Sequence, residues 1–235
     1  MITPDWYDVF GAVCKRGQGA LKWVAPEPWI QAELCAELNS RKSFTGWTAF
    51  SAEPPYMTYY PVRLPKRTGK DVTKSGAIKW ADLCLQSTTE NAWCWLELKV
   101  RHKGLEGREA FRNDVAALVG FNTDKTADTW EQPDKYTRSF QFDRFWTAEN
   151  AKELRLGVHH FVAAFLRLDD KLNPKDWGEE KLKEQVQNWV SYRHKQAGYT
   201  DPCPSVSFGL RQCEVGCHTL VLCEWTRDPN PAGAP

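Results

Sequence analysis

Residues 80–86, WADLCLQ, and residues 92–100, AWCWLELKV, are rich in large apolar side chains and are separated by the polar segment 87–91, STTEN. This pattern predicts two strands joined by a tight turn. With the tip between Thr89 and Glu90, the numbers of paired residues sum to 179, so Asp82 faces Glu97. Side chains alternate along a strand, and Lys99 therefore shares the face of Glu97. The two stretches predict a hairpin with an Asp, a Glu and a Lys close together on one face of a sheet.

Two carboxylates directly opposed in an antiparallel pair lie about 4.5–5.5 Å apart at Cβ and destabilise each other. They need protonation, separation by water or a cation between them. A hard divalent ion such as Mg²⁺ takes one or two carboxylates together with waters and phosphate oxygens. The ammonium of Lys99 would lie beside such an ion, placed to orient or deprotonate an attacking water. The pattern favours metal-assisted hydrolysis; the alternative is that Asp82 and Lys99 are solvated charges at the rim of an ordinary hairpin.

The same residues carry a resemblance to a known family. Asp82, a gap of fourteen residues and then Glu97-Leu98-Lys99 on a hydrophobic strand resemble the motif of the PD-(D/E)xK nuclease superfamily. Ala81 stands where the motif's name has Pro, and the resemblance covers roughly residues 27–170. It implies a restriction-endonuclease-like fold in which Asp82, Glu97 and the carbonyl of Leu98 hold Mg²⁺, or Mn²⁺ in its place. Lys99 would assist the water.

Residues 26–38 read as a helix, because Ile30, Leu34 and Leu38 recur at helical spacing. The resemblance implies that a Glu of the first helix points at the metal site. Glu33 is the first candidate for this third catalytic acid and Glu37 the second. The alternative is that both belong to a solvated helix face.

The formal net charge of +1 gives no overall attraction to nucleic acid, so contacts would come from a local cluster. The segment 63–79 is strongly basic and leads directly into Asp82, and further basic residues follow Lys99. Such a cluster beside an acidic metal site suits a phosphodiester substrate; the alternative is a solvated surface loop. The candidate nucleic-acid-binding residues are Lys66, Arg67, Lys70, Lys74, Arg101 and Lys103.

The remaining elements predict an α/β domain with a mixed central β-sheet flanked by helices. Helices are expected over 106–120 and 179–196, strands over 158–168, 206–210 and 219–225, and a long irregular segment over 121–150. Residues 1–26 are interpreted as an N-terminal extension with a short helix, 27–227 as a single nuclease-like domain and 228–235 as a disordered tail.

Four of the eight cysteines, Cys35, Cys84, Cys94 and Cys223, lie in apolar patterns typical of buried free thiols. Zinc sites favour closely spaced cysteine pairs, whereas Cys203, Cys213, Cys217 and Cys223 are separated by wider gaps, so zinc is not expected. No stretch approaches the roughly 20 apolar residues of a membrane span, and no secretion signal begins the chain. A cytoplasmic location without a membrane partner is the expectation.

The sequence therefore leads to one hypothesis and two rivals. The first is a Mg²⁺-dependent endonuclease acting on DNA, with a homodimer left as an option. The second is a non-catalytic module that keeps the nuclease fold and binds nucleic acid or protein. The third, a zinc-stabilised interaction domain, depends on the C-terminal cysteines.

Overall fold

The structure is a computed structural model. It describes residues 4–17, 26–41, 46–50, 54–60, 62–63, 73–74, 77–87, 89–101, 107–132, 147–168, 178–198, 209–215 and 218–228. The helices in these ranges are α1 (Trp6–Arg16), α2 (Pro26–Ser40), α3 (Arg108–Val119), α4 (Thr123–Glu131), α5 (Ala148–Leu156) and α7 (Glu179–Gln196). The strands are β1 (Trp47–Phe50), β2 (Pro55–Thr58), β3 (Val62–Arg63), β4 (Thr73–Lys74), β5 (Ala77–Trp80), β6 (Leu83–Ser87), β7 (Ala92–Arg101), β8 (Val158–Arg167), β9 (Gly209–Val215) and β10 (His218–Arg227).

The main sheet has six strands in the order β1-β6-β7-β8-β10-β9. β7 and β8 are parallel, whereas the other neighbouring strands are antiparallel, so the sheet is mixed. Leu83 pairs with Leu96 and Gln86 with Trp93, which is the register expected from a sum of 179. The α/β class and the hairpin register predicted from the sequence are confirmed.

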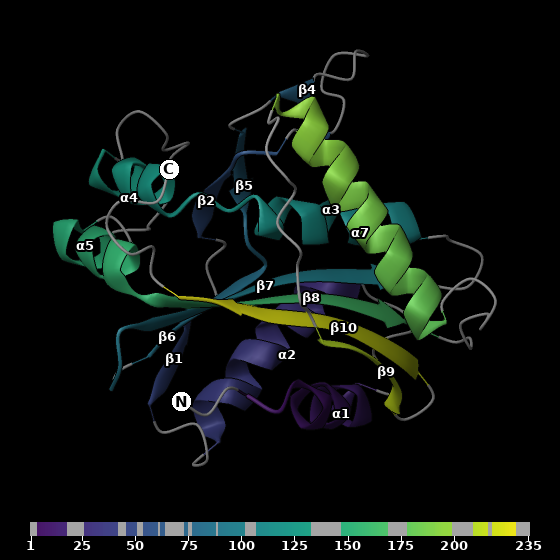
Figure 1. Ribbon diagram of the computed structural model, residues 1–235. Helices are drawn as coiled ribbons and strands as arrows, with labels where there is room; N and C mark the ends of the chain where they lie inside the picture. Colours follow the sequence, from purple (N-terminus) through teal and green to yellow (C-terminus); the bar gives the residue numbers. More distant parts are fainter. Residues whose placement is uncertain are drawn as a thin grey trace.

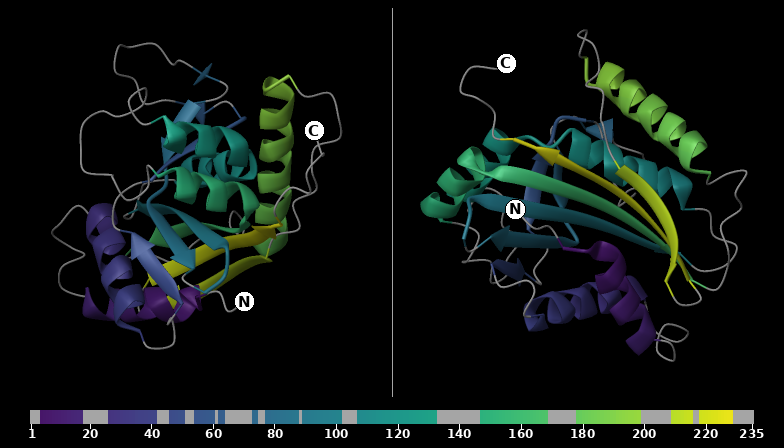
Figure 2. Two further views of the ribbon diagram at one scale, coloured as in Figure 1. Left: turned by 90° about the vertical axis from the view of Figure 1, so that its left-hand side faces the viewer. Right: turned by 60° about the horizontal axis from the view of Figure 1, so that its bottom comes forward.

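Helices cover both faces of this sheet (Figure 1). α3 and α7 lie on one face, and α1 and α2 lie on the other, as the two views of Figure 2 also show. Side chains alternate along β7 and contribute to both cores. Trp93 and Trp95 belong to the cluster that includes α3 residues, and both rings contact Trp130 of α4, whereas Leu96 and Leu98 belong to the cluster with α1 and α2. β2 pairs with β5 in a small separate sheet on the α3 side, and β3 pairs with β4 in another.

Helix α1 lies within the segment interpreted as an N-terminal extension. Its apolar face, with Val9, Phe10 and Val13, belongs to the same hydrophobic cluster as Ile30 and Leu34 of α2. Residues 6–16 therefore supply part of the core beneath the sheet.

Helix α4 contradicts the prediction of an irregular segment over 121–150. Asn122 caps the helix, because its side chain accepts a hydrogen bond from the N–H of Lys125. Thr126 and Thr129 are buried, and each hydroxyl donates to a backbone carbonyl four residues earlier. These polar residues at buried positions conceal the helical period that the sequence would otherwise show.

Cysteines 35, 84, 94 and 223 are buried free thiols, as predicted, and so is Cys14. No helix of the described ranges combines the length and the apolar character that crossing a bilayer requires. Residues 229–235, most of the predicted disordered tail, lie outside the described residues.

Candidate active site

The candidate site is built where β7 extends past its neighbour β6. β6 begins at Leu83, paired with Leu96, and β7 continues to Arg101. On the edge left without a strand, the backbone N–H groups of Leu98 and Val100 need other acceptors. The Leu98 N–H donates to Oδ2 of Asp82 at 2.5 Å, and the Val100 N–H donates to Oε2 of Glu27 at 3.1 Å. Two carboxylates thus replace the missing strand.

Asp82 is held from two sides just before β6. Besides the Leu98 bond, its Oδ1 accepts a hydrogen bond of 2.5 Å from the side-chain amide of Gln31 on α2. Burial raises the pKa of Asp82 to about 8, and the negative charge of Glu97 adds to this increase against the lowering effect of the Leu98 bond. The carboxylate is held where an extra positive charge would be favourable.

Glu97 is buried in the middle of the group. Its Oε1 accepts a hydrogen bond of 2.6 Å from the hydroxyl of Tyr56 and one of 3.3 Å from the ammonium of Lys79. Burial raises the pKa of Glu97, and the charge of Asp114 raises it further, against the lowering effect of Lys79. No donor among the described residues reaches its second oxygen, Oε2.

Charges alternate across the rest of the site. Nζ of Lys79 lies 3.1 Å from Oδ1 of Asp114 on α3, and Nζ of Lys99 lies 3.9 Å from Oδ2 of the same carboxylate. Lys99 also donates to Oε1 of Glu27 at 3.1 Å. Burial lowers the pKa of Lys99, but the negative charges of Asp114 and Glu27 outweigh burial and raise it. Asp114 therefore joins the two lysines.

Asp82 bonds to the backbone of Leu98, and its pKa responds to the charges of Glu97 and Lys99. The predicted strand over 80–86 is interrupted, however: Trp80 ends β5, β6 begins at Leu83, and Asp82 does not pair with Glu97 in the ladder. The structure does not bring Glu33 to this group. Glu33 instead lies 3.2 Å from Nε of Arg16, and Glu37 pairs with Arg16 and Arg41. Both acids lie on the flank of α2 that meets α1, and the acid of α2 that does reach the site is Glu27.

Most of the predicted nucleic-acid contacts lie outside the described residues. This applies to Lys66, Arg67, Lys70 and Lys103, and to the side chain of Lys74, whose backbone forms β4. Arg101 is described, and its Nη1 lies 3.7 Å from Oε2 of Glu27. Its predicted role in DNA binding stays a prediction.

Sequence reasoning missed Glu27, Asp114, Lys79 and Tyr56 as parts of the site. A signal existed for Asp114, because it lies three residues after Phe111 and four before Leu118, on the apolar stripe of α3. Glu27 and Gln31 are one helical turn apart and share a face of α2. Tyr56 and Lys79 could be assigned to the site only once the pairing of β2 with β5, which sets the two residues opposite each other, was known.

No group of three or more His, Cys, Asp or Glu side chains in the described ranges is arranged to hold a metal ion. A cation at Asp82 and Glu97 would therefore draw its remaining ligands from the predicted Leu98 carbonyl, from water or from substrate. The zinc hypothesis rested on residues around Cys203, Cys213 and Cys217, whose side chains lie outside the described residues.

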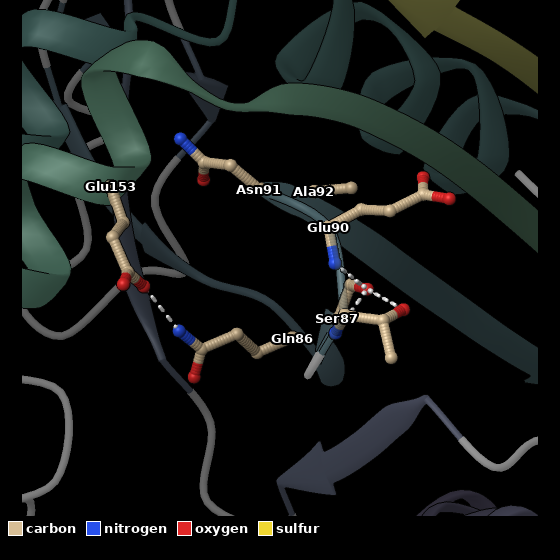
Figure 3. Close-up of a pocket in the computed structure, with 7 residues that line it drawn as sticks. Gln86, Ser87, Glu90, Asn91, Ala92 and Glu153 are labelled. Carbon is tan, nitrogen blue, oxygen red and sulfur yellow. Dashed lines mark hydrogen bonds between the residues drawn. The ribbon is translucent and has the colours of Figure 1, made fainter.

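Two pockets lie away from this group. One, of about 230 Å³, is at the opposite end of β7, where the amide of Gln86 donates to Glu153 at 2.7 Å across it (Figure 3). The other, of about 210 Å³, lies under the sheet beside Trp6, Cys94 and His160. Neither pocket is lined by any of the charged residues of the candidate site, which are Glu27, Lys79, Asp82, Glu97, Lys99 and Asp114.

Comparisons with protein-family models, with curated proteins and with solved structures found no match to this chain. The nuclease resemblance stays a prediction carried by Asp82, Glu97 and Lys99.

Proposed function

We propose that the protein is a metal-dependent nuclease that hydrolyses phosphodiester bonds in DNA. The observation that carries the proposal is the bond from the Leu98 N–H to Asp82, which holds that carboxylate beside the Glu97-Leu98-Lys99 segment. Asp82 and Glu97 are both largely buried, each has a raised pKa, and the negative charge of Glu97 contributes to the shift at Asp82. Two such carboxylates are stabilised by a cation.

The donor set fits Mg²⁺ better than a metal that requires a complete protein cage. Glu97 offers an oxygen without a described donor, and Asp82 has lone pairs left on both oxygens. Mg²⁺ accepts one or two carboxylates and keeps several waters, which phosphate oxygens can replace. When bound, the ion would stabilise charge on the phosphoryl oxygens and lower the pKa of water.

Lys99 would act as a fixed positive charge and not as a proton acceptor. Its pKa is raised by Asp114 and Glu27, so its ammonium stays protonated near neutral pH. A protonated amine can donate hydrogen bonds to water and phosphate oxygens but cannot remove a proton. Of the two roles considered for Lys99, orienting the attacking water is the one that this environment supports.

The test is incubation of the purified protein with plasmid and linear DNA in Mg²⁺, in Mn²⁺ and in EDTA. Cleavage is expected in both metals and not in EDTA. Glu97→Ala should abolish cleavage, whereas Glu90→Ala, at the exposed turn of the same hairpin, should leave it unchanged. Lys99→Ala should slow cleavage without loss of metal binding. Cutting at the wild-type rate by Glu97→Ala would reject the assignment.

A second candidate is a non-catalytic module that binds nucleic acid or protein. The observation favouring it is that Lys79 and Lys99 already neutralise the carboxylates, as in a purely structural network. Such a protein would bind DNA in Ca²⁺ and leave it uncut in Mg²⁺ and Mn²⁺.

A further inference from the structure

Lys79 connects two parts of the fold at the centre of the site. It lies on β5, paired across the small sheet with Tyr56, and its ammonium is 6.0 Å from the centre of the Tyr56 ring. Its Nζ lies 3.3 Å from Glu97 and 3.1 Å from Asp114. One ammonium is therefore shared between a carboxylate of β7 and a carboxylate of α3.

The two carboxylates that share Lys79 differ in what else they bind. Oε1 of Glu97 would keep the Tyr56 hydroxyl bond if the ammonium moved away. Oδ2 of Asp114 is buried and has no hydrogen-bond partner among the described residues, although Lys99 is an ion pair partner at 3.9 Å. A carboxylate oxygen can accept two hydrogen bonds. Asp114 thus has unused capacity next to the place where Lys79 already lies.

We propose that Lys79 is a displaceable counter-ion of Glu97, and that Asp114 takes up its ammonium when Glu97 binds a divalent cation. This rests on the proposed function, which places the cation at Asp82 and Glu97. A divalent cation and an ammonium on one carboxylate repel each other in a poorly solvated site. The lysine side chain is flexible, and its ammonium can rotate onto Asp114 without leaving the site. Lys79 would shield the buried acids in the metal-free protein and would lower their affinity for the ion.

The inference predicts opposite effects for the two partners of one contact. Lys79→Met removes the competing charge, so Mn²⁺ should bind about tenfold more tightly. Asp114→Asn removes the acceptor for the displaced ammonium, so Mn²⁺ should bind about tenfold more weakly. Asparagine at position 114 also removes a negative charge from the site, which by itself weakens binding of any cation. The double variant separates the two causes, because without Lys79 the loss of Asp114 should weaken binding by less than about threefold.

The experiment is a titration of the protein with Mn²⁺ after metal has been removed with chelator. Binding is measured by calorimetry and by electron paramagnetic resonance of the free ion. The proteins are the wild type, both single variants, the double variant and Lys79→Gln. Lys79→Gln should also bind Mn²⁺ more tightly, and it replaces Lys79→Met if methionine at position 79 prevents folding. Lys125→Met is the matched control, because it removes the lysine of an exposed ion pair of 3.3 Å with Asp128. It should leave the affinity unchanged.

The outcomes separate this inference from the function on which it rests. Equal effects of Asp114→Asn with and without Lys79, or no tightening in either Lys79 variant, would overturn the counter-ion role and leave the metal site standing. Absence of Mn²⁺ binding in the wild type and in every variant would overturn the proposed function and this inference together.

Discussion

Oδ2 of Asp82 accepts the backbone N–H of Leu98, sixteen residues later in the chain, at 2.5 Å. Leu98 lies between Glu97 and Lys99, so this bond holds the Asp82 carboxylate beside the backbone that carries the other two residues of the motif. The bond exists because β7 is longer than β6, and its edge N–H groups would otherwise be buried without an acceptor. Because β6 is shorter than β7, the Asp82 carboxylate, and not a strand, accepts the hydrogen bond from the Leu98 N–H.

The buried charges of Asp82 and Glu97 should lower the free energy of unfolding, and Asp82→Asn should raise it again. Burial and the charge of Glu97 raise the pKa of Asp82 from 3.8 to about 8. The folded state therefore holds this proton more tightly than the unfolded state, and stability falls as the pH rises from 4 towards 8. The loss at neutral pH is on the order of 2–4 kcal/mol. Asparagine can keep the Leu98 bond, and the amide of Gln31 can turn to accept from it.

The measurement is urea unfolding of both proteins in EDTA at about pH 5 and pH 8. The variant should be the more stable protein, by a margin that grows with pH, while DNA cleavage in Mg²⁺ is lost. A margin that does not change with pH would show that Asp82 is not a strained carboxylate.

Glu27, and not Glu33, should be the acid of α2 that cleavage requires. Glu27 holds both the Lys99 ammonium and the Val100 N–H, whereas Glu33 pairs with Arg16 away from the site. Glu27→Gln should lower kcat by about 10- to 100-fold with little change in KM for DNA, because it loosens Lys99 and not the substrate. Glu33→Gln is the matched control and should keep the wild-type rate. If Glu33→Gln is the slower of the two, Glu27 is not the acid of α2 on which cleavage depends.

The sequence could predict the hairpin because all its determinants are local. Apolar alternation, a polar turn and a two-residue side-chain period are enough to place Asp82, Glu97 and Lys99 together. Which glutamate of α2 reaches the site, Glu27 or Glu33, cannot be predicted from the local sequence. It depends on which flank of α2 faces β7, and α1 decides this by supplying Arg16 to Glu33 and Glu37. Lys79 and Asp114 likewise meet only through the packing of β5 and α3 on β7.

His159 should make the fold sensitive to acid. The indole N–H of Trp95 donates to its Nδ1 at 3.1 Å, and its Nε2–H donates to the carbonyl of Leu154 at 2.9 Å. Burial lowers the pKa of His159 to about 4. The unfolded state takes up the proton first, so this contribution to stability is complete above about pH 6.5 and is lost as the pH falls towards 4.

His159→Gln removes the titrating group and should flatten the pH dependence. Between pH 7 and pH 4.5 the free energy of unfolding of the wild type should fall by about 2–3 kcal/mol more than that of the variant. Urea titrations at the two pH values measure both. Parallel losses in the two proteins would mean that other groups dominate acid unfolding.

The basic segment 63–79 should reveal DNA binding through salt dependence. The formal net charge is only +1, so affinity for DNA must come from local contacts. Each phosphate neutralised by Lys or Arg steepens the fall of log affinity with log salt by roughly 0.9 on duplex DNA. Replacing Lys66, Arg67, Lys70 and Lys74 with Ala should therefore flatten the slope by about three to four units if all four meet phosphates.

The matched control removes the same charge from exposed lysines on four helices, Lys15, Lys125, Lys152 and Lys181. Both quadruple variants are compared with the wild type by DNA binding in Ca²⁺ across a salt series, and Mn²⁺ binding is measured in parallel. The loop variant should lose the salt slope and keep its affinity for Mn²⁺, because Asp82 and Glu97 are held by β6, β7 and α2. The control should keep both. Equal slopes in all three proteins would mean that Lys66, Arg67, Lys70 and Lys74 meet no phosphates, and the substrate path would then lie near Arg101 and Lys103.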